Sequence, residues 1–221
     1  VKKSNFMTSS KKICVLGTGS WGSALALTMA QQGDSITLWG HNPHHVEEIK
    51  ISRLNPTYVP GVIFPKNIHL THELAECADA DVIFFVIPSK FLRNVATAFA
   101  KVTPRFSGTL ISCTKGIEHS SGKLMSEVLA EILPHASMAV LSGPNLAGDI
   151  SRGLPAAGVL GCEEPALTTS LLSIFQETSY RAYSSSDIRG IQLGGALKNI
   201  FAIAAAVSDG LGMGENARAG I

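Results

Sequence analysis

The pattern of apolar and polar positions along the chain predicts strands that alternate with helices. Short apolar runs predict strands at 13–16, 35–39, 67–71, 81–87, 109–112, 138–142, 156–160 and 180–184. Helical patterns fall at about 20–32, 43–50, 72–78, 89–101, 124–133 and 165–175, and prolines predict an irregular loop at 52–66. Strands that alternate with helices at this spacing predict an α/β fold with a doubly wound, mostly parallel sheet.

The pattern changes after residue 187. Residues 188–207 are apolar around most of a helix, so we expect a long helix that other helices cover. The chain would then divide into a sheet domain, 1–187, and the beginning of an all-α C-terminal domain, 188–221, which we expect to be only begun within this sequence. The apolar run at 200–207 is too short to span a bilayer, so we expect no stable membrane insertion.

Three glycines, Gly17, Gly19 and Gly22, follow the first predicted strand. Their G-x-G-x-x-G spacing between a strand and a helix is typical of a Rossmann-like dinucleotide-binding turn. Gly17 would allow the tight turn, Gly19 the approach of a pyrophosphate, and Gly22 the close packing of helix on strand. The free N–H groups of the helix start favour phosphate. An ordinary glycine-rich turn is the alternative.

Composition and residue spacing limit which binding partners and which cell compartment we expect for this protein. The net charge is +1 without a basic block, so we expect neither nucleic acid nor an anionic membrane as partner. The four cysteines lie singly along the chain, which indicates small buried side chains in a reducing compartment. Residues 1–11 are polar and are expected to be disordered, and they lack the apolar core of a signal peptide, so a cytoplasmic location is expected. The histidines show no ligand spacing, and we predict no metal site.

Ligands of open α/β sheets lie outside the carboxyl ends of the strands, so residues there are candidates. His41 follows the second strand, where an NAD-selective enzyme usually has an acidic residue, so NADP(H) should be tolerated. Phe91 follows the fourth strand, and Lys115 the fifth, where it would meet an anionic or carbonyl substrate. Gly143 and Asn145 follow the sixth strand in a tight loop. The alternatives are a turn residue for His41, core packing for Phe91, a surface lysine for Lys115 and a helix cap for Asn145.

Lys198 is the sharpest single candidate because it interrupts an apolar helix. Gly194 and Gly195 precede it by one turn on the same face, toward which its side chain should lean. Two helical glycines cost about 1 kcal/mol each relative to alanine, and space for a ligand beside the lysine would explain them. We therefore expect Lys198 to be buried, with a pKa lowered toward the range useful for proton transfer. A lysine that reaches solvent at a domain edge is the alternative.

Taken together, the segments 17–26, 114–118, 142–147 and 194–218 resemble the NAD(P)-dependent glycerol-3-phosphate dehydrogenases. The resemblance covers nearly the whole chain in the family's order. It implies reversible reduction of dihydroxyacetone phosphate to sn-glycerol 3-phosphate by hydride transfer from NAD(P)H, which supplies phospholipid synthesis. A homodimer is one expected assembly.

The resemblance also implies residue roles. Lys198 would be the acid and base, and Lys115, Gly143 and Asn145 would join it in contacting the substrate. Bacterial members of the family usually carry Ser or Thr at the position of Asn145. The residues expected at the cofactor are Gly17, Gly19, Ser20, Trp21, Gly22, His41, Phe91, Lys115 and Ala147. A later Asp and a later Arg-Asn pair of the family would follow Ile221.

Two other functions stay open at this point. One is a related two-domain dehydrogenase of hydroxy or keto acids that uses the same lysine. The other is a non-catalytic Rossmann module that senses NAD(P), although a sensor has no need of a proton donor such as Lys198.

Overall fold

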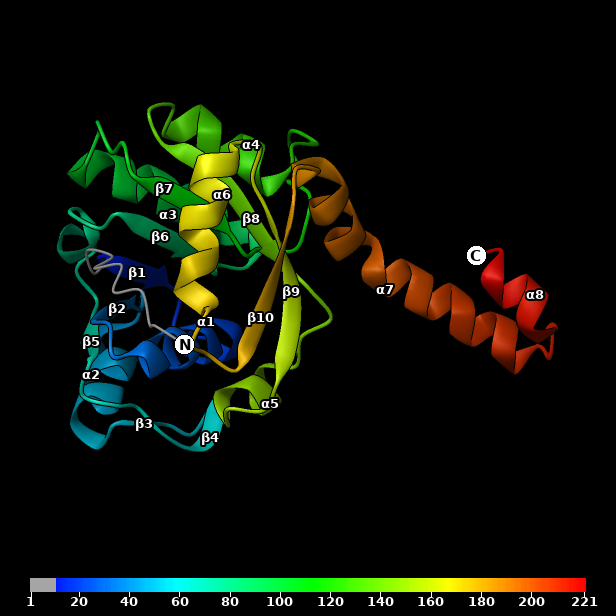
Figure 1. The fold of residues 1–221 in the computed structure, drawn as a ribbon, viewed down its shortest axis with the longest axis horizontal. Coiled ribbons are helices and arrows are strands. Elements are labelled where there is room, and N and C mark those ends of the chain that lie inside the picture. The colour runs from blue at the N-terminus through cyan, green and yellow to red at the C-terminus, as the bar shows by residue number, and fades with distance from the viewer. Residues whose placement is uncertain (1–10) are drawn as a thin grey trace, which may run out of the picture.

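The computed structural model describes residues 11–221, so the predictions made for the first ten residues lie outside it. An eight-stranded sheet forms the centre, in the order β10-β9-β8-β7-β6-β1-β2-β5 (Figure 1). Its strands are β1 (Ile13–Leu16), β2 (Ile36–Trp39), β5 (Ile68–Thr71), β6 (Val82–Phe85), β7 (Thr109–Ser112), β8 (Ser137–Ser142), β9 (Ala156–Gly161) and β10 (Tyr180–Ser185). All neighbouring pairs are parallel except β8 and β9, which confirms the predicted mostly parallel, doubly wound sheet.

Helices cover both faces of the sheet. One face carries α1 (Ser20–Met29), η1 (Ala30–Gln32), α2 (Pro43–Ser52), α5 (Ala147–Ser151), α6 (Pro165–Leu172) and η3 (Ser173–Phe175). The other carries η2 (Leu74–Cys77), α3 (Ser89–Val102) and α4 (Met125–Ile132). The predicted helix at 72–78 is therefore only a short 3₁₀ turn.

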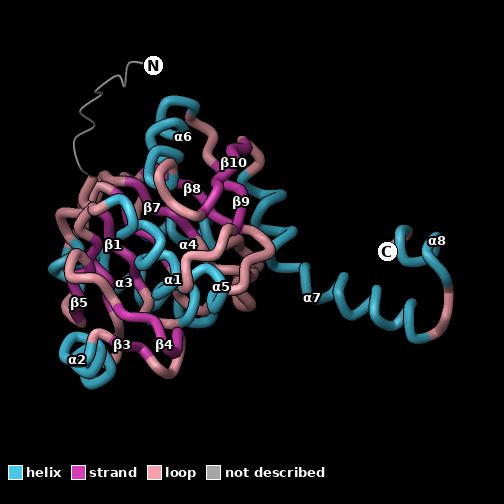
Figure 2. The backbone as a smooth tube through the Cα atoms, turned by 60° about the horizontal axis from the view of Figure 1, so that its bottom comes forward, coloured by secondary structure: helices cyan, strands magenta, loops and turns pink. Residues whose placement is uncertain are grey.

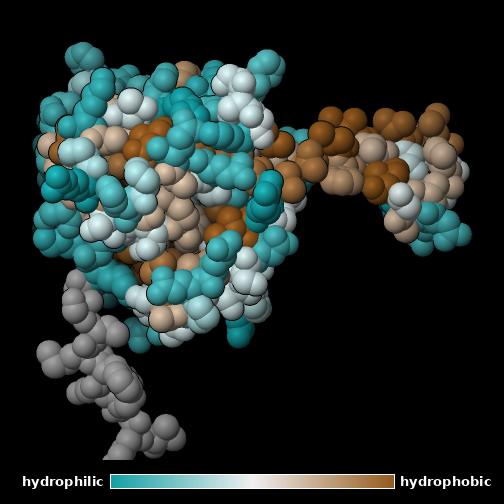
Figure 3. Space-filling model, turned by 90° about the horizontal axis from the view of Figure 1, so that it is seen from above, coloured by the Kyte–Doolittle hydropathy of each residue, from teal (hydrophilic) through white to brown (hydrophobic). Residues whose placement is uncertain are grey.

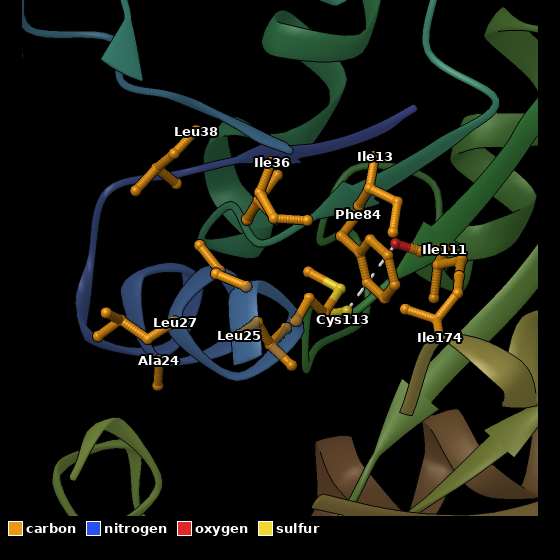
Figure 4. Packing of buried hydrophobic residues seen from close by; sticks show 14 of the residues in the cluster. Ile13, Ala24, Leu25, Leu27, Ile36, Leu38, Phe84, Ile111, Cys113 and Ile174 are labelled. Carbon is orange, nitrogen blue, oxygen red and sulfur yellow. Dashed lines mark hydrogen bonds between the residues drawn. The ribbon is translucent and has the colours of Figure 1, made fainter. Parts of the chain in front are cut away.

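The strands alternate their side chains between two apolar clusters. In β1, Ile13 and Val15 join the cluster under α1, while Cys14 and Leu16 join the cluster under α3 and α4. Figure 4 shows the first cluster, with Ile36 and Phe84 of the sheet lying over Leu25 of α1. All four cysteines are buried and free, as predicted from their single positions far apart along the chain. Apolar residues on both faces of the inner strands explain why these runs lack polar positions.

The predicted loop at 52–66 is wrong in part. It contains a small antiparallel pair, β3 (Leu54–Asn55) and β4 (Val59–Ile63). Pro60 lies within β4, which is possible because this two-stranded sheet leaves edge positions where no N–H is needed. Arg53, which has a left-handed backbone (φ of 56°), ends α2 and turns the chain into β3. Its guanidinium donates to the carbonyls of Phe64 and Ile68 at 3.1 and 2.9 Å, which ties the open end of the β3–β4 pair to the start of β5.

The last two helices, α7 (Ile188–Gly210) and α8 (Gly214–Ala219), form an arm that leaves the body of the protein (Figures 1 and 2). We expected other helices to cover α7, and this is wrong for the described residues, because only α8 packs against its far half. Figure 3 shows the apolar surface gathered along this arm. Ile200, Phe201, Ile203, Val207 and Leu211 are each at least half exposed.

The length argument does not decide whether the chain inserts into a membrane, and the expectation of no stable insertion stays a prediction. The run at 200–207 belongs to α7, which has 23 residues and is long and apolar enough to cross a bilayer by length and composition. The division of the chain at 187/188 stays a prediction.

Candidate functional site

The strand order reverses between β1 and β6, and their carboxyl ends meet at the register pair Leu16–Phe85. A cleft of about 1060 Å³ opens at this point. Its lining includes Gly17, Gly19, Trp21, Gly22, His41, Phe91, Lys115, Gly143, Asn145 and Ala147. The structure thus brings ten of the twelve predicted site residues around one cleft, and ligand sites of open α/β sheets lie at this type of position.

The three glycines of the turn have different surroundings. Gly17 has a φ of 130°, and a side chain there would run into the carbonyl of Val86. A side chain at Gly22 would run into the carbonyl of Gly17. A Cβ at Gly19, by contrast, would have no atom within 4 Å. Gly17 and Gly22 therefore serve the packing of α1 against the strands, while Gly19 leaves open space in the cleft.

Asn55 supports this turn from the β3–β4 pair, a role that no pattern in the sequence predicts. Its side chain is fully buried, and Nδ2 donates to the Thr18 carbonyl at 2.9 Å and to the Ser23 hydroxyl at 3.1 Å. The Ser23 hydroxyl donates in turn to the Thr18 carbonyl at 3.2 Å. A segment read as an irregular loop thus holds the glycine turn in place.

The end of β2 forms one side of the cleft. His41 is exposed there, and Asn42 begins α2 by accepting from the backbone N–H groups of His44 and His45 at 3.0 and 3.3 Å. Asn42 is therefore a helix cap. The His45 ring lies edge-on to Tyr58, with centroids 5.6 Å apart, and both residues line the cleft. Tyr58 comes from the segment predicted as a loop, so the sequence pattern did not single it out.

Phe91 lies on the first turn of α3 and is 47% exposed at the cleft. The alternative that it packs in the core is wrong, because its neighbour Leu92 takes the buried position. The Lys90 ammonium lies 4.7 Å from the centre of the Phe91 ring. Phe91 thus offers an aromatic surface to a ligand in the cleft.

Lys115 follows β7 and lines the cleft together with the glycine turn. Its Nζ donates to the Gly143 carbonyl at 2.9 Å. Loss of hydration lowers the pKa of Lys115 below the ordinary lysine value, and the nearby positive charge of Lys198 lowers the pKa further. Lys115 is exposed, so the alternative of a surface lysine stays open, although its ammonium is tied to the loop after β8.

Lys198 is exposed on α7, so the expected burial is wrong. The reason is the open arm, which leaves this face of α7 without a neighbouring helix among the described residues. Gly195 explains how Lys198 nevertheless comes near Lys115. A Cβ at Gly195 would lie 2.8 Å from the Ser142 hydroxyl and 3.4 Å from Cγ of Lys115, whereas one at Gly194 would meet nothing within 4 Å. Only Gly195 therefore permits the close approach of α7 to the strand ends.

Two of the predicted residues do not line the cleft. Ser20 is the first residue of α1 and is half-buried beside Gly19. Lys198 lies beyond the Lys115 side of the cleft lining.

The loop after β8 is fixed by Asn145. Its Nδ2 donates to the Ala157 carbonyl at 2.7 Å, and its Oδ1 accepts from the Tyr180 hydroxyl at 2.9 Å. The alternative of a helix cap is wrong, because α5 begins at Ala147 with Leu146 as its N-cap residue. Tyr180 is a second residue that the sequence pattern did not single out.

These groups define the chemistry available in the cleft. One end has a helix N-terminus above an open glycine, which suits a phosphate group. The other end has the ammonium group of Lys115, with Lys198 of α7 outside the lining on the same side; two such cations suit an anionic substrate and a proton transfer at an oxygen. The cleft between them has the volume and the aromatic surface for an extended ligand.

Comparisons with known proteins agree with this arrangement. The family model described as the N-terminus of NAD-dependent glycerol-3-phosphate dehydrogenase matches residues 12–168, and the model of the C-terminus matches residues 187–221. The glycerol-3-phosphate dehydrogenase (NAD(P)+) of Rhodopseudomonas palustris strain BisB5 is 42% identical over 217 residues, which cover 96% of this chain and 64% of that protein. The protein of the same name from Paramagnetospirillum magneticum strain AMB-1 is 41% identical over 211 residues, covering 96% and 76%.

A solved structure gives the same result. The crystal structure of glycerol-3-phosphate dehydrogenase from Coxiella burnetii superposes with a TM-score of 0.85 at 34% identity, covering 96% of this chain and 65% of that one. The chain thus spans slightly less than two thirds of the Rhodopseudomonas palustris and Coxiella burnetii proteins, at 64% and 65%, and about three quarters of the Paramagnetospirillum magneticum protein, at 76%.

The glycine surroundings predict different effects of one substitution at two positions. Gly22→Ser should lower the free energy of unfolding by about 1–3 kcal/mol, because its side chain has to displace the Gly17 backbone. Gly19→Ser should change the free energy of unfolding by less than about 0.5 kcal/mol, because its Cβ points into open space and Ser is a favourable N-cap residue. Denaturant unfolding followed by circular dichroism measures both. Equal losses at the two positions would contradict the packing described for the turn.

Proposed function

Because the chain belongs to the NAD-dependent glycerol-3-phosphate dehydrogenase family, we propose that it reduces dihydroxyacetone phosphate reversibly to sn-glycerol 3-phosphate, using NAD(P)H. The product would supply phospholipid synthesis. The observation that carries this proposal is the approach of α7 to the end of β7 beside the cleft, where a Cβ at Gly195 would lie 3.4 Å from Cγ of Lys115. Lys198 follows Gly195 by three residues, and its positive charge contributes to the lowered pKa of Lys115. A phosphate ester with a ketone group offers each cation an oxygen to bind.

The residues of the cleft fit a dinucleotide. Gly19 leaves space above the start of α1, where free N–H groups suit a pyrophosphate. Ser20 and Trp21 would contact the cofactor at this turn, and Phe91 and Ala147 would lie along the rest of it. His41 would lie near the adenosine ribose, without the negative charge that repels a 2′-phosphate. When bound, NAD(P)H supplies the hydride for the ketone carbon.

The chain's own residues would bind the substrate and move the proton. Lys115, Gly143 and Asn145 would hold the substrate oxygens, and the ammonium of Lys115 would stabilise negative charge that develops there. Lys198, as ammonium, would protonate the oxygen of the former ketone and become an amine. In the reverse direction the amine would take the proton of the alcohol.

The position of Lys198 also favours a water-soluble, cytoplasmic enzyme over a membrane protein. Lys198 is the eleventh of the 23 residues of α7, so a membrane-spanning α7 would place its charge near the bilayer centre. A lysine at that depth costs about 2.5–3.5 kcal/mol. On the Lys115 side of the cleft, by contrast, the charge of Lys198 would help to bind the anionic substrate and would supply the proton. The expectations of a homodimer, and of no nucleic acid or metal as partner, stay predictions.

The first test of the proposal is the substitution Lys198→Ala. It should lower kcat for dihydroxyacetone phosphate about 10²- to 10⁴-fold, because the proton donor is lost. Binding of NADH should stay within a few-fold of the unsubstituted protein, since the glycine turn is intact. Steady-state kinetics and a fluorescence titration with NADH measure the two effects. Lys101→Ala, at an exposed position near the end of α3, is the matched control. A Lys198→Ala protein with unchanged kcat would show that another group transfers the proton.

The second test uses the lowered pKa of Lys115. The Lys115 ammonium should lose its proton at a lower pH than an ordinary lysine, so affinity for glycerol 3-phosphate should fall as the pH rises through that lowered pKa. In Lys115→Arg the charge persists, because a guanidinium has a pKa above about 12, and the fall should move to higher pH. Inhibition constants between about pH 7 and 10.5 measure this, a range in which the substrate phosphate stays doubly charged. Identical pH profiles for the two proteins would exclude Lys115 as the titrating group.

A further inference from the structure

A buried tyrosine at the edge of the sheet contacts Asn145, one of the residues that line the cleft. Tyr180 opens β10, is 1% exposed, and lies two strands away from β8. Its hydroxyl donates to Oδ1 of Asn145 at 2.9 Å. Burial raises the pKa of Tyr180, so the phenol stays protonated and remains a donor over the whole physiological pH range.

The strand between them is shaped to let this contact form. β9 separates β8 from β10, and a side chain at Gly158 of β9 would collide with the Tyr180 hydroxyl. A Cβ at Gly143 would lie 2.9 Å from Oδ1 of Asn145 and 2.8 Å from the Ala157 carbonyl. The contact between Tyr180 and Asn145 therefore depends on two positions without side chains.

The hydrogen bonds leave only one orientation for the Asn145 carboxamide. The Ala157 carbonyl can only accept, so the group that lies 2.7 Å from it has to be the amide nitrogen. The amide oxygen then faces Tyr180, whose hydroxyl donates to it. Asn145 keeps one N–H and one oxygen lone pair for other partners, and the residue lines the cleft.

We propose that Tyr180 is a positioning residue for the active site, which holds the Asn145 carboxamide in one orientation so that Asn145 can bind the substrate oxygens. This inference rests on the proposed reduction of dihydroxyacetone phosphate, in which Asn145 contacts the substrate. Tyr180 does not line the cleft, so its proposed effect on the substrate passes through Asn145.

The test is Tyr180→Phe, which keeps the ring and its packing against Trp21, 6.3 Å away between centroids, and removes only the hydroxyl. Without this donor, the Asn145 side chain keeps only the hydrogen bond from Nδ2 to the Ala157 carbonyl, and its amide oxygen is held less tightly. KM for dihydroxyacetone phosphate should rise about three- to ten-fold, the factor that corresponds to one ordinary hydrogen bond. The kcat and the dissociation constant of NADH should each change less than about two-fold, because neither Lys198 nor the glycine turn is touched. Tyr183→Phe is the matched control, since Tyr183 lies on the same strand and is 54% exposed.

A double-mutant cycle separates positioning from a merely structural role. On an Asn145→Ala background, Tyr180→Phe should leave KM unchanged within about two-fold, because the group that it positions is gone. An equal rise of KM on both backgrounds, or no rise on the native background, would overturn the role of Tyr180. If the unsubstituted protein turns over no dihydroxyacetone phosphate, the proposed function fails, and this inference fails with it. Activity of the unsubstituted protein with an unchanged Tyr180→Phe overturns the inference alone.

Discussion

The close contact of α1 with the ends of β1 and β6 is the constraint on which the rest of the site depends. It exists because Gly17 and Gly22 have no side chains at the two positions where backbone meets backbone. This contact directs the N-terminus of α1 toward the cleft, where Gly19 lines the wall and leaves space for a ligand. Asn55 holds the same turn from the β3–β4 pair, through buried hydrogen bonds to Thr18 and Ser23. A dinucleotide site of this kind is therefore a consequence of backbone packing more than of specific polar side chains.

A second contact joins the arm to this site. Gln192 of α7 is buried and forms a pair of hydrogen bonds with Ser126 at the start of α4, donating to its hydroxyl at 2.8 Å and accepting from its N–H at 3.0 Å. One turn later, Gly195 lets α7 pass close to Ser142 and Lys115. These two contacts fix the direction of α7 and so bring Lys198 to the Lys115 side of the cleft. Gln192, which anchors the arm, and Lys198, the proposed proton donor, thus lie on the same helix.

Local patterns predicted the strands, the helices and the glycine turn, because hydrophobic period and turn chemistry are local properties of the sequence. The roles of Asn55 and Tyr180 depend on contacts between segments far apart in the chain, 32 to 37 residues for Asn55 and 35 for Tyr180. No local pattern marks such contacts. The expected burial of Lys198 was wrong for a related reason. An apolar sequence shows that a helix is suited to burial, but whether a residue of that helix is buried depends on which other segments pack against it. The two glycines before Lys198 were expected to leave space for a ligand. At Gly195 the structure shows close packing against Ser142 and Lys115 instead, and at Gly194 the expected ligand space stays a prediction.

The central claim is that a cleft built on a glycine turn and two lysines reduces a phosphorylated ketone. The most direct measurement is the oxidation of NADH and of NADPH by the purified protein, with dihydroxyacetone phosphate, a keto acid or no ketone added, together with identification of the product. The account predicts oxidation with dihydroxyacetone phosphate, formation of sn-glycerol 3-phosphate in equal amount, and no oxidation above background with the keto acid. Turnover of the keto acid alone, or tight binding of the cofactor without turnover of either ketone, would contradict it.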